Sequence, residues 1–130
     1  MKISEAARHS GLAAKTIRYY ESIGLFSSDR QGNGYRDYQE EDVKQLRFIN
    51  RARQLGFSLD ECRGLLQLFR DPHRASRNVK ELAESRMHLI DEQIENLMAM
   101  KKTLSTLIHQ CPGNDHSDCV ILDKLADDEH

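Results

Sequence analysis

From Ser76 to about His109 the chain contains no glycine or proline. Its seam positions, all apolar except for one lysine, recur at alternating steps of four and three residues: Ala83, Met87, Ile90, Ile94, Leu97, Lys101, Leu104 and Ile108. This heptad pattern predicts a helix of roughly 34 residues, about 50 Å long, that carries a seam of the coiled-coil type.

The seam is too long to be covered by a small domain, and the whole chain has only 130 residues. An identical chain is the simplest partner, so we expect a homodimer joined through this helix. A helix that folds back on its own domain is the alternative. We expect three parts: a domain at residues 1–70, the dimerisation helix at 71–110 and a C-terminal segment at 111–130.

Two short helices joined by a glycine turn are predicted at the N-terminus. The first is expected to be capped by Ser4 and to end at Gly11. The second is expected to run from about Ala13 to Ile23 and to end at Gly24. Helix, tight turn and helix in this order are typical of a helix-turn-helix motif.

A hairpin is expected next, because Gly32-Asn33-Gly34 supplies the positive-φ residues of a tight turn. Tyr35 and Tyr38 flank Arg36 on its returning side, so the hairpin resembles the wing of a winged-helix domain. Two helices follow before Asp71-Pro72 breaks the chain. Their expected inward-facing residues are Val43, Leu46, Ile49 and Ala52 on the first, and Leu59, Cys62, Leu65, Leu66 and Phe69 on the second, which Ser58 caps.

The second helix of the helix-turn-helix carries groups suited to phosphate oxygens and base edges. These candidate DNA contacts are Lys15, Thr16, Arg18, Tyr19 and Tyr20, with Arg18 the first choice and one of the two tyrosines expected to be structural. Arg36 and Tyr38 are the candidates on the wing. Residues 1–70 carry 12 Lys and Arg against 9 Asp and Glu, a surplus too small to establish a polyanion partner alone.

Two of the three cysteines, Cys111 and Cys119, bracket a stretch of turn-forming residues. The chain has no apolar run long enough for a membrane span or a signal peptide, so we expect a cytoplasmic protein. A lasting disulfide is disfavoured in that compartment, which leaves a metal site or a redox pair. A short helix capped by Ser117 or Asp118 is expected to place Cys119 in its first turn, where the thiolate is favoured, under an apolar cover from Val120, Ile121, Leu122 and Leu125.

The motifs ISEAARHSGLAAKTIRYYESIGL, GNGYRDY and RARQLGFSLDE, followed by a long helix and a terminal cysteine loop, resemble the MerR family of bacterial transcription regulators along essentially the whole chain. The resemblance implies a mainly α fold: a winged helix-turn-helix domain, a long antiparallel coiled-coil dimerisation helix and a short metal-binding loop and helix. It also implies a homodimer that binds a palindromic promoter element in double-stranded DNA, distorts it when an inducer binds and so acts on RNA polymerase.

The branches of this family differ in the inducer that they sense. In the branches that sense divalent ions, a further cysteine stands at the start of the dimerisation helix, and Ser76 occupies that position here. Two thiolates without a third suit a soft monovalent ion, Cu(I) and also Ag(I) or Au(I), and leave Zn(II) short of ligands. The pattern is similar to the copper-responsive CueR-type branch, in which Cys111 and Cys119 are the implied ligands and copper efflux genes the implied targets.

Two alternatives to a copper sensor remain open from the sequence. One is a sensor of Zn, Cd or Hg that recruits His109 or His116 as a further ligand. The other is a thiol redox regulator or enzyme that uses Cys111 and Cys119. Their spacing is not that of a Cys-x-x-Cys motif, and no catalytic constellation accompanies them, so we expect no enzyme.

Overall fold

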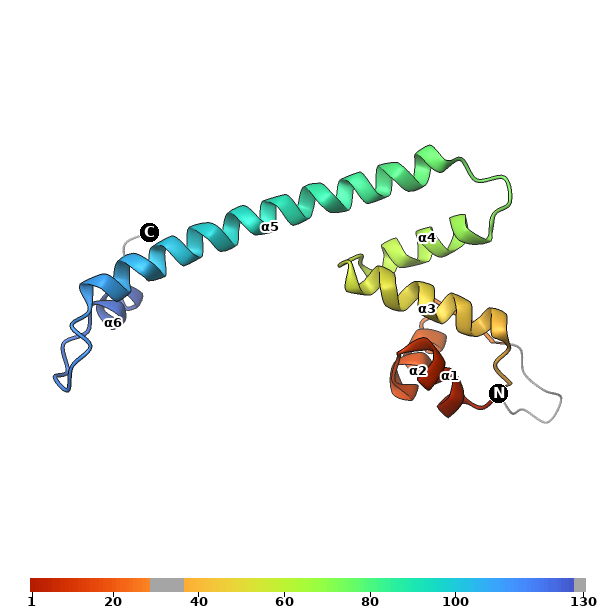
Figure 1. Cartoon of the computed structure of the whole chain (residues 1–130), viewed down its shortest axis with the longest axis horizontal. Helices are drawn as coiled ribbons and strands as arrows, with labels where there is room; N and C mark the ends of the chain where they lie inside the picture. The colour runs from red at the N-terminus through yellow and green to blue at the C-terminus, as the bar shows by residue number, and fades with distance from the viewer. Residues whose placement is uncertain (29–36, 128–130) are drawn as a thin grey trace. The chain divides into compact units, whose positions relative to one another are not determined.

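The computed structural model describes residues 1–28 and 37–127. Within these ranges the chain forms six α-helices and divides into two compact units, with the boundary between Arg86 and Met87 (Figure 1). The expected hairpin at residues 32–34 and Arg36 lie outside the described residues. The mainly helical architecture agrees with the fold class predicted from the sequence.

Helices α1 (Ile3–Ser10) and α2 (Ala14–Ser22) form the helix-turn-helix. The turn begins at Gly11, whose φ of +79° is readily adopted only by glycine. A Cβ atom added there would also lie 2.8 Å from Nδ2 of Asn50, which donates a hydrogen bond to the carbonyl of Ser10. The predicted cap at Ser4 is wrong: the N-cap is Lys2, two residues earlier, so Ser4 lies inside the first turn.

Helices α3 (Glu40–Gln54) and α4 (Leu59–Arg70) complete the first unit together with the start of α5. The predicted cap of α4 is confirmed: the backbone N–H of Glu61 donates to Oγ of Ser58 and the N–H of Ser58 donates to Oε1 of Glu61, at 3.1 and 2.8 Å. Helix α4 ends at Arg70, just before Asp71-Pro72, as expected.

One hydrophobic core unites the first unit. The inward residues predicted on α3, Val43, Leu46, Ile49 and Ala52, are all buried. On α4 Cys62, Leu65 and Leu66 are buried, while Leu59 and Phe69 are partly buried against the same core. Val79 and Leu82 from the first turns of α5 also pack on it, so the beginning of the long helix is anchored in this unit.

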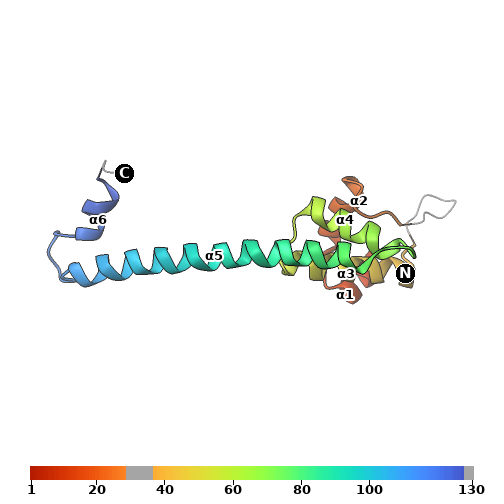
Figure 2. The same cartoon turned by 90° about the horizontal axis from the view of Figure 1, so that it is seen from above.

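Helix α5 (Ser76–Gln110) is one unbroken helix of 35 residues, close to the predicted limits (Figure 2). Five residues of its predicted seam in the second unit, Met87, Ile94, Leu97, Leu104 and Ile108, are about half or more exposed within the single chain, whereas Ile90 is partly buried. Leu107, which lies outside the predicted seam, is the buried residue of α5. In the described part of the chain, no helix is long and apolar enough to cross a membrane.

Candidate metal centre and DNA interface

Cys111 stands directly at the end of α5. Its backbone N–H donates to the carbonyls of Leu107 and Ile108, at 3.1 and 3.3 Å, so the residue prolongs the last helical turn. The chain then turns at Gly113, whose φ is +64°. The N–H of His116 donates to Oδ1 of Asn114 at 2.9 Å, which tightens the loop. The sulfur of Cys111 is thereby held on a helix end rather than on the loop itself.

Cys119 is the N-cap of the short helix α6 (Val120–Leu125). The sequence analysis predicted a cap at Ser117 or Asp118, with Cys119 in the first turn of the helix. The predicted cap is wrong by one or two residues, because the N-cap is Cys119 itself. No side-chain cap hydrogen bond is formed, but the backbone N–H of Leu122 stabilises a thiolate at this position. Chiefly for this reason the pKa of Cys119 is lowered, with smaller contributions from the Cys111 thiol and the N–H of Ile121.

The two thiols face each other. The Sγ atoms of Cys111 and Cys119 lie 3.9 Å apart, and both residues are partly buried and free of disulfide bonds. Two metal–thiolate bonds of about 2.3 Å laid end to end span about 4.6 Å, so a small opening of the loop would fit an ion between the sulfurs. Two soft donors at this separation suit a cation with few ligands.

The apolar cover expected over the thiols is incomplete within one chain. Val120 and Ile121 are partly buried, as expected of such a cover. Leu122 and Leu125 are instead 64% and 75% exposed. Helix α6 has only six residues, and none of them is buried. Its apolar side chains therefore need a further protein surface to be shielded from water.

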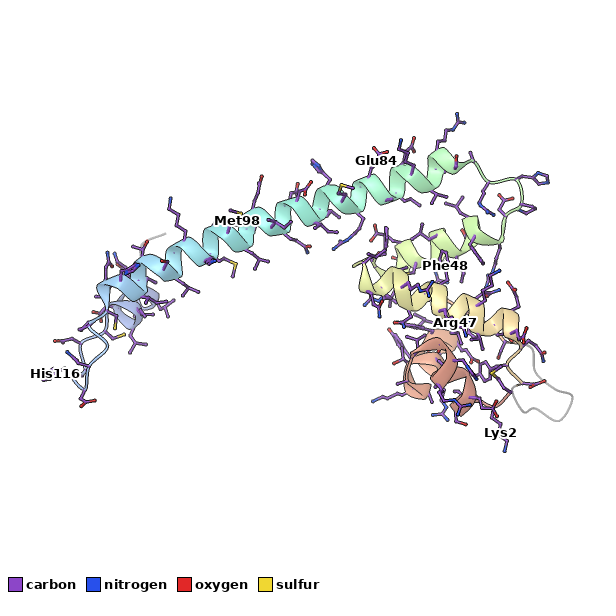
Figure 3. All side chains as sticks on the ribbon, viewed as in Figure 1. Lys2, Arg47, Phe48, Glu84, Met98 and His116 are labelled. Carbon is purple, nitrogen blue, oxygen red and sulfur yellow. The ribbon has the colours of Figure 1, made fainter. Side chains whose placement is uncertain are left out.

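No third ligand joins the two sulfurs in the part of the chain that the structure describes, where no group of three His, Cys, Asp or Glu residues is close enough to hold a metal. His109 and His116 are exposed, and Figure 3 shows His116 on the loop beyond the end of α5. Cys62 lies in the core as predicted, and burial raises the pKa of its thiol. Ser76 is the first residue of α5, at the other end of that helix from Cys111.

The candidate DNA contacts on α2 divide into exposed and buried side chains. Lys15, Arg18 and Tyr19 are exposed and Thr16 is partly buried. Tyr20 is buried in the core, whereas Tyr19 is 51% exposed, so the expectation that one of the two tyrosines is structural is confirmed. The exposed residues fall on one side of α2 because Ile17 and Tyr20 occupy the buried side.

Tyr38 does not present its phenol to solvent. Its side chain is 1% exposed, its ring stacks on Phe26 at 6.4 Å between centroids, and its hydroxyl donates to Oε1 of Glu21 at 2.5 Å. We therefore correct its assignment from a DNA contact to a core residue whose hydroxyl reaches α2. A tyrosine beside a predicted wing has the same sequence pattern whether it contacts DNA or packs in the core. Only the burial of Tyr38 in the structure distinguishes the two roles.

One residue that contacts α2 was missed by the sequence. The guanidinium of Arg63, on α4, donates to two backbone carbonyls at the end of α2. The two partners are about 40 residues apart along the chain, and a single arginine on an amphipathic helix gives no local pattern that marks such a contact. One sign in the sequence was that α2 has no basic residue in its own last turn, so a cation from another helix could bind there.

Comparisons with known proteins bear on both regions. The profile of the MerR HTH family regulatory proteins matches residues 1–68, and the profile described as MerR, DNA binding matches residues 43–107. The transcriptional regulator HmrR of Rhizobium leguminosarum bv. viciae is 52% identical over 127 residues, which cover 98% of this chain and 98% of that protein. The regulator CueR of Salmonella typhimurium is 41% identical over 127 residues, covering 97% and 92%.

A solved structure is similar along the same length. The transcription regulator PbrR691 from Ralstonia metallidurans CH34, crystallised in complex with lead(II), superimposes with a TM-score of 0.82. The two sequences are 32% identical, and the match covers 97% of this chain and 99% of that one. The similarity therefore includes the helix-turn-helix, the long helix and the cysteine loop.

Proposed function

The chain belongs to the MerR family of helix-turn-helix regulatory proteins, and we propose that it is a copper-responsive transcription activator. In this proposal a homodimer binds a palindromic promoter element, and one Cu(I) ion is captured by Cys111 and Cys119 in each loop. The bound metal favours the dimer state that distorts the DNA, so that RNA polymerase engages the promoter. Ag(I) and Au(I) are expected to act in the same way.

The 3.9 Å separation of the two sulfurs is the observation that carries the proposal. Two thiolates carry two negative charges and satisfy a soft monovalent ion without further ligands, whereas Zn(II) prefers four. The lowered pKa of Cys119 supports the same assignment, because it increases the thiolate fraction at neutral pH. Serine at position 76 leaves the chain without the third thiol that would favour a divalent ion.

The exposed seam of α5 supports the homodimer. Large apolar side chains such as Met87, Leu97 and Ile108 are each more than 60% exposed in the single chain, which is costly in water and is relieved by a second copy. In an antiparallel pair, the start of one α5 lies beside the end of the other. Ser76 of one chain then approaches the cysteine loop of its partner, and the exposed leucines of α6 gain a surface to cover.

The exposed groups of α2 support the DNA-binding role. Lys15 and Arg18 offer cations to phosphates, and Arg18 is long enough to reach a base edge in the major groove. Arg36, outside the described residues, is proposed to contact the backbone from the wing. A regulator that changes promoter shape needs to stay bound in both states, so metal is expected to change transcription more than operator affinity.

Transcription in vitro with buffered metals tests the proposal directly. An operator is first selected by the purified protein from random duplex DNA and placed in a promoter with an overlong spacer. Transcription is then measured across buffered Cu(I), Ag(I), Zn(II), Cd(II) and Pb(II). Activation by the monovalent ions alone is expected. The copper assignment would be overturned if Zn(II) or Pb(II) activated transcription at a free concentration at which Cu(I) did not.

A divalent sensor is the second candidate, because the similar regulator from Ralstonia metallidurans CH34 was crystallised with lead(II). For this chain such a site would need a third donor, for example His109 or His116 or a group of the partner subunit. Titration of the protein with Zn(II) and Pb(II) in a competing chelator, followed by the same titration of a His109→Ala, His116→Ala double variant, separates the two candidates. Tight divalent binding that the double variant loses would support the second.

A further inference from the structure

The end of α2 is held by a side chain from another helix. Nη1 of Arg63 lies 3.0 Å from the carbonyl oxygen of Gly24, and Nη2 lies 3.1 Å from the carbonyl oxygen of Ile23. Both carbonyls follow the last residue of α2, Ser22. A single guanidinium thus donates two hydrogen bonds to consecutive backbone groups, a geometry that fixes direction as well as distance.

The position of this contact suits the chemistry of a helix end. The last carbonyls of a helix lack partners within the helix, and the helix dipole makes this end favourable for a cation. Helix α2 has no basic residue in its last turn. Within α2 the last-turn carbonyls of Tyr19, Tyr20 and Glu21 accept from backbone N–H groups that follow the helix. Arg63 therefore supplies from α4 a positive charge beside this helix end and donors for the next two carbonyls, those of Ile23 and Gly24.

A second polar contact holds the same end of α2. Glu21, the last residue but one of the helix, accepts the hydroxyl hydrogen bond of the buried Tyr38 at 2.5 Å. Tyr38 lies between α2 and α3 in the sequence and Arg63 lies on α4, so the two contacts come from different elements. Rotation of α2 about its axis or sliding along it would break both, while the exposed Arg18 and Tyr19 on the same helix remain free to meet DNA.

We infer that Arg63 is a positioning residue for DNA recognition: it fixes the orientation of α2 against α4 without touching DNA. The inference rests on the proposed role of α2 at the DNA. A misplaced recognition helix loses the geometry of base contacts more than it loses phosphate contacts, since the latter tolerate small displacements. Loss of Arg63 therefore lowers operator affinity while leaving non-specific affinity and the number of released counterions unchanged.

The test compares Arg63→Ala and Arg63→Lys with a matched control, Arg74→Ala. Arg74 also donates through its guanidinium to two carbonyls at a helix end, those of Phe69 and Asp71 at 3.2 and 3.1 Å, but the helix is α4. Metal-free protein is titrated with the selected operator and with random duplex DNA at several salt concentrations. Circular dichroism confirms that each variant is folded at the temperature used.

We expect Arg63→Ala to weaken operator binding about tenfold, since a tilted α2 weakens base contacts and the loss of one such contact lowers affinity by about this factor, with an unchanged salt slope and unchanged binding to random DNA. Arg63→Lys recovers part of the loss, and Arg74→Ala binds like the parent. Equal operator affinity for folded Arg63→Ala and parent would overturn the inference, as would an equal loss on random DNA. Arg18→Ala is run in parallel: if it too leaves operator binding unchanged, the proposed DNA interface has failed instead.

Discussion

The sulfur atoms of Cys111 and Cys119 lie 3.9 Å apart although the residues belong to different helical elements. Cys111 prolongs the last turn of α5, and Cys119 is the N-cap of α6. The loop between them has only to reverse the chain direction, which its glycine and Asx turn achieve. A pair of donors fixed by two helix ends is preorganised for a small ligand, because little conformational entropy is lost when an ion joins them.

Cys111→Ser and Cys119→Ser are each expected to abolish induction by Cu(I), since one remaining thiolate cannot hold the ion alone. Operator binding should stay within about twofold of the parent, because the candidate DNA contacts lie in the separate first unit. Transcription and operator binding are measured side by side, with Cys62→Ser as the cysteine control. A loss of DNA affinity as large as the loss of induction would show that the loop has a structural role instead.

Thiol labelling across pH is expected to distinguish the cysteines. The N–H of Leu122 lowers the pKa of Cys119, so its thiolate persists to lower pH than that of an ordinary cysteine. Burial raises the pKa of Cys62 and also shields it, so Cys62 should be the slowest to react. Iodoacetamide labelling of metal-free protein, read by mass spectrometry of peptides, gives each rate against pH. Copper should protect Cys119 at every pH, and a Cys119 profile midpoint above that of the denatured chain would contradict the assignment.

Arg18→Ala is expected to weaken operator binding and to make its salt dependence shallower by about one counterion. Arg36→Ala should behave in the same way if the wing contacts the backbone. The measurement is the slope of log K against log salt concentration, with metal affinity as the control that should not change. If neither variant changes the slope, the phosphate contacts lie elsewhere on the protein.

Most of the fold could be predicted because it depends on local patterns. The heptad seam located α5 within one or two residues, and the predicted cap at Ser58 located the start of α4. Helix starts without a side-chain cap were less certain, and both the Ser4 cap and the cap before Cys119 were misplaced for this reason. Contacts between residues distant in the sequence leave no periodic signal. The burial of Tyr38 and the hydrogen bonds from Arg63 to the residues after α2 are therefore visible only in the structure.

Tyr38→Phe is expected to lower the free energy of unfolding by about 1–2 kcal/mol, because it removes a hydrogen bond to a carboxylate and keeps the buried ring. Tyr19→Phe is the matched control: its phenol is half exposed, so its loss should change stability by less than about 0.5 kcal/mol. Urea denaturation of both variants measures the difference. Equal stability of Tyr38→Phe and parent would mean that the contact with Glu21 contributes nothing to the fold.

Ser76→Cys tests the choice of metal most sharply, because it adds the one thiol whose absence argues for a monovalent ion. Ser76 and Cys111 stand at opposite ends of α5, so only a second, antiparallel chain brings position 76 beside the cysteine loop. A third thiolate there balances the second charge of Zn(II), Cd(II) or Hg(II) and raises the number of ligands toward what these ions prefer.

The variant is expected to bind divalent ions at least tenfold more tightly than the parent, as measured by chelator competition, while Cu(I) affinity changes less. Ser76→Ala is the control, since it removes the hydroxyl and adds no donor. Activation by the divalent ion is a separate requirement, because occupancy induces transcription only if the liganded loop favours the DNA-distorting state. Unchanged divalent affinity in a folded, dimeric Ser76→Cys protein would place Ser76 away from the loop, and the argument for Cu(I) would then rest on the two sulfurs alone.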